Sequence, residues 1–492
     1  MQLKRLYIKD YKILKDFTLE FPNDSKKYIS VFIGANGSGK STILEAIAQI
    51  FSDVLLGEKS KFEFELHYSV IGVDASDIEN QVNHAQVCLY AANKSVIRYQ
   101  LKTSQSKSNM IDDYAKPELL NNVFIQGENV RIFNLLPDNL VIYYSGLSEI
   151  MEGISKPHED KLSKAYRKGN ANIDRDFFYY KPEHFGIILL SLLSFEYGDV
   201  PEFLKNKAKI EGVQSIQINL KKSSLWQPKD SIENFWGAEG EVRRFLDFLK
   251  EQSQTDKNIG IKAIKGEKIA ISLKGKETLY KIRDFLIEEK KLFEILNIML
   301  ADSLLDNISF SLIKITEVKQ QVFNILSEGE QQALIIKGLT EFLSGRNTLF
   351  LFDEPDTYLH PEWQRQFIPE IQTTVDNALD SENYYLIATH SPNIVSGIEK
   401  DSLFVLEHGD VKEIPFNSYG KNVESLLIDF FNVEGVRNKY VESLLTEVQN
   451  MVKNKQFDSP DFKNKFQELK DILRPTAPEI VNINLEIAKS RK

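Results

Sequence analysis

The chain has 492 residues, of which 42% are hydrophobic and 27% charged, and its formal net charge is -10. This balance excludes a disordered or collagen-like chain and is typical of two or three globular domains. The acidic charge argues against a protein that coats DNA, because such binding needs clustered Lys and Arg. It leaves open a local basic groove formed in an oligomer.

The N-terminal third is predicted to be rich in strands. Three strands are predicted within residues 1–34. In KRLYIKDYKIL and DFTLEF, apolar and polar residues alternate with a period of two, and YISVFIG is a continuous apolar run. STILEAIAQIF then has helical spacing. Alternating stretches within 60–105 predict antiparallel strands, and LVIYYSGL (140–147) predicts a buried strand.

The pattern changes after residue 149. EVRRFLDFLKEQ and TLYKIRDFLIEEKKLFEILNIML predict amphipathic helices, and strands are expected at about 214–220, 260–273 and 307–315. No heptad pattern persists, so a long coiled coil is not expected.

Strand and helix alternation returns over 316–415. LSEGEQQALIIKGLTEFL and WQRQFIPEIQTTVDNAL predict helices, NTLFLFDEP and YYLIATHS predict buried strands, and SLFVLEHGDVKEIPF predicts a hairpin that turns at Gly-Asp. Residues 416–492 predict a helical tail with a break at DILRPTAPE. Its apolar stripe must bury against the chain's own core or against a partner; it consists of Tyr440, Leu444, Leu445 and Val448.

The start of the chain and its cysteine content indicate a compartment. MQLKRLYIKDYKIL lacks the apolar core of a signal peptide, and no run approaches the roughly 20 apolar residues of a membrane-spanning helix. The single cysteine, Cys88, excludes an internal disulfide and a zinc site built from cysteines. We therefore expect a cytoplasmic protein without a membrane partner.

The first chemical motif is GANGSGKS, which matches G-x-x-x-x-G-K-[ST] between a buried strand and a helix. Backbone amides of such a loop hold phosphates, Lys40 reaches the β and γ phosphates, and the Ser41 hydroxyl binds Mg²⁺. The predicted ATP-binding residues are Gly34, Asn36, Gly37, Gly39, Lys40, Ser41 and Thr42.

The second motif is the acidic end of NTLFLFDEP. Asp353 is predicted to hold Mg²⁺ together with Ser41. Glu354 is predicted to polarise the attacking water, as phosphoryl transfer to water requires.

The third motif, LSEGE, resembles the ABC signature, usually LSGGQ or LSGGE, with Glu328 in place of the first glycine. Its Ser327, Gly329 and Glu330 begin a helix, which is a natural anion site, and Ser327 with Glu330 also predicts a capping box. In ABC ATPases this motif binds the γ-phosphate of ATP held by the partner subunit, so the resemblance implies a homodimer as the catalytic unit.

Four assignments of histidine, lysine and glutamine residues rest on motif order. His390 in ATHS occupies the position of the histidine that contacts the γ-phosphate in this superfamily. His360 in YLHP is either interfacial or a helix cap. Lys12 either lies near the phosphates or is a solvated strand lysine. Gln126 either coordinates Mg²⁺ and water or lies on the surface.

Together these residues resemble the OLD/RecF/SMC-like ABC ATPases of bacterial anti-phage defence. The tail GKNVESLLIDFFNVEG is similar to PtuA-type ATPases of the Septu and retron-associated group, with the AriA ATPase of PARIS as a near competitor. The resemblance implies an ABC-type α/β P-loop ATPase head, formed by 1–149 and 316–415, with mixed or parallel sheet and an antiparallel β lobe. We further expect an α+β lid over 150–315 and a helical tail over 416–492.

The same resemblance implies cofactors and partners: ATP, Mg²⁺, a higher homo-oligomer, and a nuclease effector of the His-Asn-His or Toprim-like type, with nucleic acid reached through the complex. A RecF/SMC-like ATPase of DNA repair or DNA clamping is the alternative. The long separation between GANGSGKS and LSEGE argues against a transporter subunit. An intrinsic Toprim domain is not expected, because no Asp-x-Asp follows Glu434 and Gly435.

Overall fold

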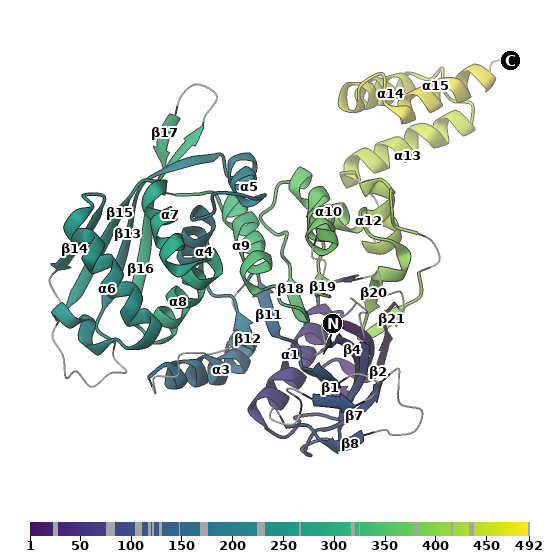
Figure 1. Ribbon diagram of the computed structural model, residues 1–492. Coiled ribbons are helices and arrows are strands. Elements are labelled where there is room, and N and C mark those ends of the chain that lie inside the picture. The colour runs from purple at the N-terminus through teal and green to yellow at the C-terminus, as the bar shows by residue number, and fades with distance from the viewer. Residues whose placement is uncertain are drawn as a thin grey trace. The chain divides into compact units, whose positions relative to one another are not determined.

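The computed structural model describes residues 1–22, 28–74, 84–103, 111–116, 120, 123–126, 130–146, 148–167, 176–223, 232–264, 267–315, 320–323, 325–377, 382–414, 417–431 and 437–490. The chain forms two compact units, Met1–Tyr419 and Gly420–Lys492, each of which is described by itself (Figure 1). None of the described helices is long and apolar enough to cross a membrane.

A seven-stranded sheet forms one layer of the larger unit, with all strands parallel except the last. Its order is β12 (Phe177–Tyr179), β11 (Asn139–Tyr144), β18 (Thr348–Asp353), β19 (Tyr384–Ala388), β3 (Ile29–Gly34), β20 (Leu403–Glu407) and β21 (Asp410–Lys412). Strands β3, β18 and β19 are buried along their whole length, as expected of apolar runs covered on both faces.

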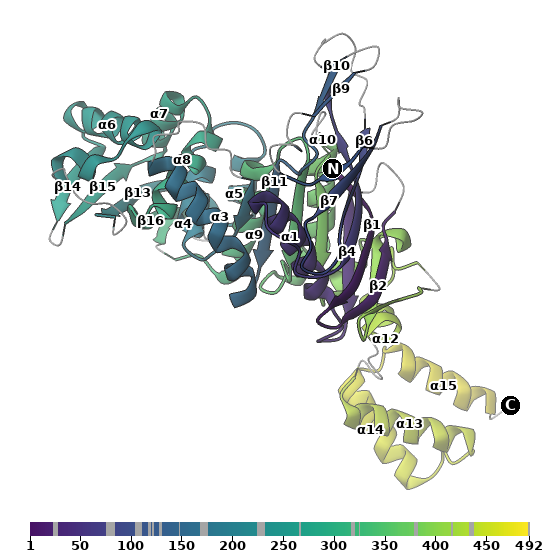
Figure 2. The ribbon, with the colours of Figure 1, turned by 90° about the horizontal axis from the view of Figure 1, so that it is seen from below.

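An antiparallel sheet forms the second layer of this unit. Its order is β2 (Leu14–Glu20), β1 (Gln2–Tyr11), β4 (Phe64–Ile71), β6 (His84–Ala91), β7 (Arg98–Thr103) and β8 (Ile111–Tyr114). A separate ribbon contains β5 (Val73–Asp74), β10 (Val130–Phe133) and β9 (Val123–Gln126) (Figure 2). The predicted strands within 1–34 and 60–105 are confirmed.

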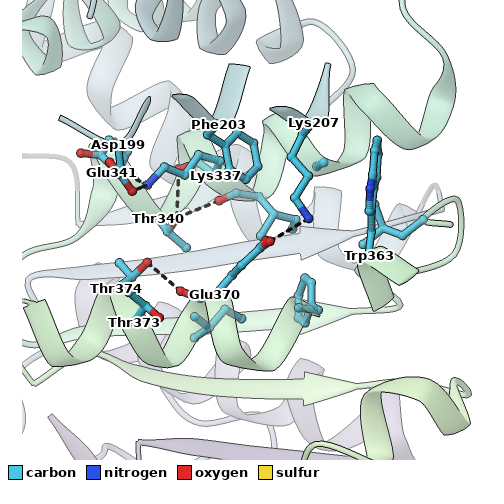
Figure 3. Close-up of a pocket in the computed structure, with 15 residues that line it drawn as sticks. Asp199, Phe203, Lys207, Lys337, Thr340, Glu341, Trp363, Glu370, Thr373 and Thr374 are labelled. Atoms are coloured by element: carbon cyan, nitrogen blue, oxygen red, sulfur yellow. Dashed lines mark hydrogen bonds and ion pairs between the residues drawn. The ribbon is translucent and has the colours of Figure 1, made fainter. Parts of the chain in front are cut away.

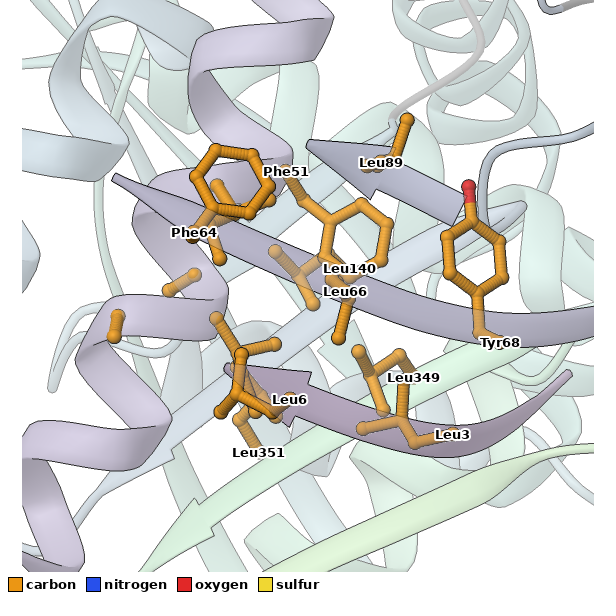
Figure 4. Packing of buried hydrophobic residues seen from close by; sticks show 14 of the residues in the cluster. Leu3, Leu6, Phe51, Phe64, Leu66, Tyr68, Leu89, Leu140, Leu349 and Leu351 are labelled. Carbon is orange, nitrogen blue, oxygen red and sulfur yellow. The ribbon is translucent and has the colours of Figure 1, made fainter. Parts of the chain in front are cut away.

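Helix α1 (Lys40–Leu56) is buried along nearly its whole length because side chains from both sheets close around it. Phe51 packs edge-on to Tyr68 with ring centroids 5.7 Å apart. Figure 4 shows Leu3, Leu6 and Leu66 of the antiparallel sheet meeting Leu140, Leu349 and Leu351 of the parallel sheet. This core fixes the first turn of α1 against the carboxyl ends of the parallel strands.

The segment after residue 149 contributes to the parallel sheet and also forms a five-stranded sheet of its own. Helix α3 (Glu149–Arg167) packs on α1, and β12 is the edge of the parallel sheet. The five-stranded antiparallel sheet has the order β14 (Ile259–Ile264), β15 (Lys268–Lys274), β13 (Ile210–Lys221), β16 (Leu305–Ile315) and β17 (Gln320–Phe323).

Helices cover one face of this five-stranded sheet (Figure 1): α6 (Gly240–Thr255), α7 (Lys276–Leu286) and α8 (Glu289–Ala301). A short 3-10 helix, Ile232–Gly237, precedes α6. Helices α4 (His184–Leu193) and α5 (Val200–Lys207) connect this part to α9 (Glu328–Leu343). Among the described residues, the first unit also contains α10 (Pro361–Asn377), α11 (Pro392–Val395) and the 3-10 turn Lys400–Ser402.

Three local predictions are wrong. The stretch 260–273 is a hairpin, β14 and β15, rather than one strand. The long helix in TLYKIRDFLIEEKKLFEILNIML breaks at Ile287, which adopts a φ of 79° and is 86% exposed, so that α7 and α8 can both pack on the sheet. The β20–β21 hairpin turns at His408 and Gly409, since its two turn residues both need positive φ.

The second unit is helical, as predicted: α12 (Val423–Phe431), α13 (Lys439–Lys453), α14 (Pro460–Leu473) and α15 (Pro478–Ser490). Leu444 and Val448 of α13 are buried against Phe466 and Ile480 of the following helices. Tyr440 is exposed and donates a hydrogen bond to Glu468 over 2.6 Å. The interior of the predicted stripe is therefore covered by the tail itself.

Candidate active site

The phosphate-binding loop joins β3 to α1 at the carboxyl edge of the parallel sheet. Gly34 has a φ of 150°, and a Cβ there would meet the Leu406 carbonyl oxygen at 2.2 Å. Gly37 also has a positive φ, 77°. No side chain caps the start of α1, so its first backbone N–H groups remain available to an anion.

Lys40 reaches across this loop to the end of β19. Its Nζ donates to the carbonyl oxygen of Gly34 at 2.9 Å, and lies 3.3 Å from that of Ala35 and 2.8 Å from His390 Nε2. An ammonium group has no acceptor, so His390 Nε2 acts as the acceptor in this contact. Burial, and then the charge of Lys40, lower the pKa of His390, which favours the neutral ring.

Asp353 ends β18 inside the protein, and neither of its carboxylate oxygens has a hydrogen-bond partner of normal geometry among the described residues. Burial raises its pKa to about 6, although the nearby Ser41 hydroxyl and Lys40 act to lower it. The buried Ser38 hydroxyl is likewise unpartnered within the described chain. Oxygen donors left without partners fit a hard cation such as Mg²⁺ and the phosphates that accompany it.

Glu354 adopts a left-handed backbone conformation with a φ of 53°, which is rare for a residue with a side chain. Its amide donates to the Ala388 carbonyl over 2.8 Å, and its Oε1 lies 3.4 Å from His390 Nε2. Burial, followed by the charges of Asp356 and Asp353, raises its pKa to about 7. A carboxyl group with this pKa can accept a proton near neutral pH.

The LSEGE segment begins α9 with the predicted capping box. The Ser327 hydroxyl accepts from the Glu330 amide at 3.4 Å, and the Glu330 carboxylate accepts from the Ser327 amide at 2.9 Å. Glu330 also pairs with Lys314. A Cβ at Gly329 would meet the Tyr358 carbonyl oxygen at 2.7 Å. Ser327 is exposed, and among the described residues its hydrogen bonds do not reach the phosphate-binding loop.

Two buried polar residues that the sequence analysis missed hold these motifs together. Gln332 donates to the Glu354 carbonyl oxygen and accepts from the Tyr358 amide. Asp356 accepts from the Thr389 hydroxyl at 2.7 Å, which joins the β18 and β19 ends. A polar residue on the buried face of a helix, such as Gln332 in LSEGEQQ, is the signal that could have indicated the first of them.

The structure places Lys12, His360 and Gln126 in different parts of the first unit. Lys12 lies in the β1–β2 turn with a φ of 54°, and its Nζ pairs with Glu45 of α1 at 2.6 Å; it is not a strand lysine. His360 caps α10, because its Nδ1 and carbonyl accept from the first turn of that helix. Gln126 ends β9, outside the parallel sheet, and its side chain lies outside the described atoms.

The remaining loop assignments are simple to place. Asn36 lies in the exposed part of the loop, and Thr42 is half-buried in the first turn of α1. Gly39 directly precedes α1 with a φ of 111°.

A cavity of about 380 Å³ lies between α5, α9 and α10, next to the LSEGE helix. Lys337 Nζ pairs with Asp199 at 2.7 Å and with Glu341 at 3.0 Å, whereas Lys207 pairs with Glu370 at 2.7 Å and lies over the ring of Trp363 (Figure 3). The cavity joins three segments: the part after residue 149, the helix that LSEGE begins, and the helix that follows Tyr358.

Comparison with known proteins gives a match of residues 1–395 to the AAA ATPase domain family. The Retron Ec83 probable ATPase of Escherichia coli is 22% identical, over 99% of this chain and 87% of that protein. The Retron Vc95 probable ATPase of Vibrio cholerae serotype O1 biovar El Tor is 23% identical, over 93% of this chain and 85% of that protein. Septu protein PtuA of Bacillus thuringiensis is 26% identical, over 37% of this chain and 49% of that protein.

Among solved structures, the chain matches the Smc head domain of Pyrococcus furiosus bound to the C-terminal domain of ScpA. That match has 14% identity and a TM-score of 0.31, and it covers 84% of this chain and 95% of that one.

Proposed function

The chain belongs to the AAA ATPase domain family and is an ATPase, and we propose that it acts as a dimer within a bacterial anti-phage defence complex. The single observation that carries the catalytic part is the meeting of Lys40, Glu354 and His390 near the buried carboxylate of Asp353, which has no hydrogen-bond partner of normal geometry among the described residues. These residues come from the carboxyl ends of adjacent parallel strands, where open α/β sheets bind their ligands.

The proposed roles follow from the contacts. The loop amides and Lys40 bind the phosphates of ATP, and Ser41 with Asp353 holds Mg²⁺, which neutralises charge on those phosphates when bound. Glu354 orients the water and takes its proton as the water oxygen bonds to the γ-phosphorus and ADP leaves. His390, held neutral beside Lys40, contacts the γ-phosphate.

The proposed dimer rests on the LSEGE segment. Ser327 is exposed at a helix N-terminus, and its bonds within the described chain are local. Ile325 and Tyr358 beside it are 81% and 49% exposed. A helix N-terminus flanked by exposed apolar side chains is suited to meet the γ-phosphate of ATP held by a second copy.

A defence role is supported by the likeness to two retron ATPases that covers almost the whole chain, and by the shorter likeness to PtuA. We propose a nuclease partner of the His-Asn-His or Toprim-like type. Because the tail buries its own stripe, the cavity between α5, α9 and α10 is the preferred docking place. A partner side chain there would contact the LSEGE helix directly.

Catalysis is tested by Glu354→Gln and Lys40→Ala. The first should bind ATP and lose turnover by about 10²-fold or more, because an amide cannot take the proton of water. The second should lose ATP binding as well. ATP hydrolysis by Glu354→Gln at the wild-type rate would disprove the assigned base.

Docking is tested by co-purification with the product of the gene beside this one. Phe203→Ser combined with Trp363→Ser changes the cavity, and Tyr197→Ser, at a 76% exposed aromatic outside its lining, is the matched control. A third protein lacks 420–492, which form a separate unit. We expect only the cavity variant to lose the partner. Retention by a cavity variant that still hydrolyses ATP would exclude this docking place.

A further inference from the structure

Three side chains that commonly bind metals gather on the outer face of the antiparallel sheet, away from the ATPase site. His67 of β4 lies directly opposite Cys88 of β6 in the strand register, and Glu65 precedes His67 by two residues on the same face. The donor atoms of the three residues all lie within 4.8 Å of one another.

The spacing of these atoms agrees with tetrahedral coordination. The distance between Cys88 Sγ and His67 Nε2 is 3.6 Å. With Zn–S near 2.3 Å and Zn–N near 2.0–2.1 Å, a tetrahedral angle places sulfur and nitrogen about 3.6 Å apart. The Glu65 carboxylate contacts His67 Nε2 directly, and rotation about its side-chain torsions would open this contact to admit an ion.

The surrounding sheet holds the three residues in place. Phe64, Leu66 and Leu89, which alternate with them along the strands, are buried in the core on the opposite face. A one-residue slip would turn the donors inward and the apolar side chains outward, so the register is strongly specified. Arg5 of the adjacent β1 donates to Glu65 Oε1 at 3.0 Å, which orients the carboxylate as outer partners of metal ligands do.

We propose that Glu65, His67 and Cys88 form a Zn²⁺ site with a fourth position open to water. This mixed site needs only one cysteine, so it differs from the zinc sites built from several cysteines that a single Cys88 excludes. A thiolate combined with an imidazole favours zinc over Mg²⁺, which prefers oxygen donors alone. The site is separate from the nucleotide-linked cation site at Asp353. It would join β4 to β6 by a side-chain link across the middle of the sheet.

The test uses the full chain without a polyhistidine tag, freed of metal and titrated with Co²⁺, then with Zn²⁺ in competition. A thiolate bound to Co²⁺ gives a charge-transfer absorption that cobalt at an oxygen site lacks. Wild type should show this absorption at one Co²⁺ per chain and lose it as Zn²⁺ displaces the cobalt. Cys88→Ser should abolish the absorption, and Glu65→Gln should weaken Zn²⁺ binding at least tenfold.

His84→Gln is the matched control, because His84 begins the same strand and pairs with Glu382 instead. It should bind like wild type. The ATPase activity of each variant checks that its fold is intact. If Cys88→Ser does not fold, the Zn²⁺ affinity of Glu65→Gln, at a partly exposed position, tests the proposed site instead. No charge-transfer absorption in wild type, or full Zn²⁺ affinity in folded Glu65→Gln, would overturn the proposal.

Discussion

The side-chain nitrogen of Gln332 lies 3.4 Å from the backbone carbonyl oxygen of Glu354, and the Gln332 side-chain oxygen accepts from the Tyr358 amide at 2.8 Å. The buried side-chain amide of Gln332 thus joins the LSEGE helix to Glu354, the proposed base. If LSEGE meets ATP held by a second copy, this contact gives each subunit a path from its partner's nucleotide to its own Glu354.

Gln332→Glu should lower kcat about tenfold with little change in KM for ATP, because a carboxylate can accept from Tyr358 but cannot donate to Glu354. Steady-state kinetics with a thermal unfolding curve would measure this. Gln331→Glu, at the neighbouring and less buried position, is the control. An unchanged kcat in Gln332→Glu would show that the contact does not position the base.

The activity should depend on pH through Glu354. Its pKa is raised from 4.5 to about 7, so the carboxyl is mostly protonated below that value and cannot act as a base. kcat/KM should therefore fall about tenfold per unit as the pH drops below about 7, and level off above it. A profile that stays flat between pH 5.5 and 8, with the protein folded throughout, would contradict the assignment.

Asp353→Asn should stabilise the protein in the absence of Mg²⁺ and nucleotide while abolishing Mg²⁺-dependent hydrolysis. Burial raises the pKa of Asp353 from 3.8 to about 6, so ionisation weakens the folded state progressively as the pH rises between these values. Urea unfolding at pH 8 should show a gain of at most about 3 kcal/mol, which disappears near pH 4. A loss of stability at pH 8 would argue that the carboxylate has a favourable partner.

Ser327→Asp keeps a good helix cap but places a negative charge where the partner's γ-phosphate is expected, whereas Ser327→Asn is a neutral cap of equal size. We expect the Asp variant to lose activity far more than the Asn variant. Mixing Ser327→Asp with Lys40→Ala should restore activity above both parents, because some dimers then contain one intact composite site. Heterodimers without any recovered activity would exclude sharing of the site between subunits.

Local patterns were sufficient to predict the parts of the site that are adjacent in sequence. The apolar run before Gly34, the acidic end of β18 and the capping box at Ser327 each depend on a few neighbouring residues, and the structure has the predicted element at each. The predicted α/β class is confirmed in the same way, by a parallel sheet, an antiparallel lobe and a helical tail.

Pairings between distant segments could not be predicted by this reasoning. The sequence of Phe177–Tyr179 contains no pattern that predicts its pairing with β11 at the edge of the parallel sheet. The hydrogen bond from Gln332 to Glu354 could not be predicted either, because it depends on how α9 packs against the end of β18. Ile287 breaks a continuous helical pattern for a tertiary reason, the packing of α7 and α8 on one sheet.

The β20–β21 turn has a practical consequence for anyone who trims this protein. Gly409 donates its amide to the Ser38 carbonyl of the phosphate-binding loop at 3.0 Å, and a Cβ there would meet the Ile13 carbonyl oxygen at 2.6 Å. The family match ends at residue 395, yet β20 is a direct neighbour of β3. A fragment cut at that boundary would leave β3 with an open edge and the loop without its outer support, so the smallest useful fragment extends beyond β21.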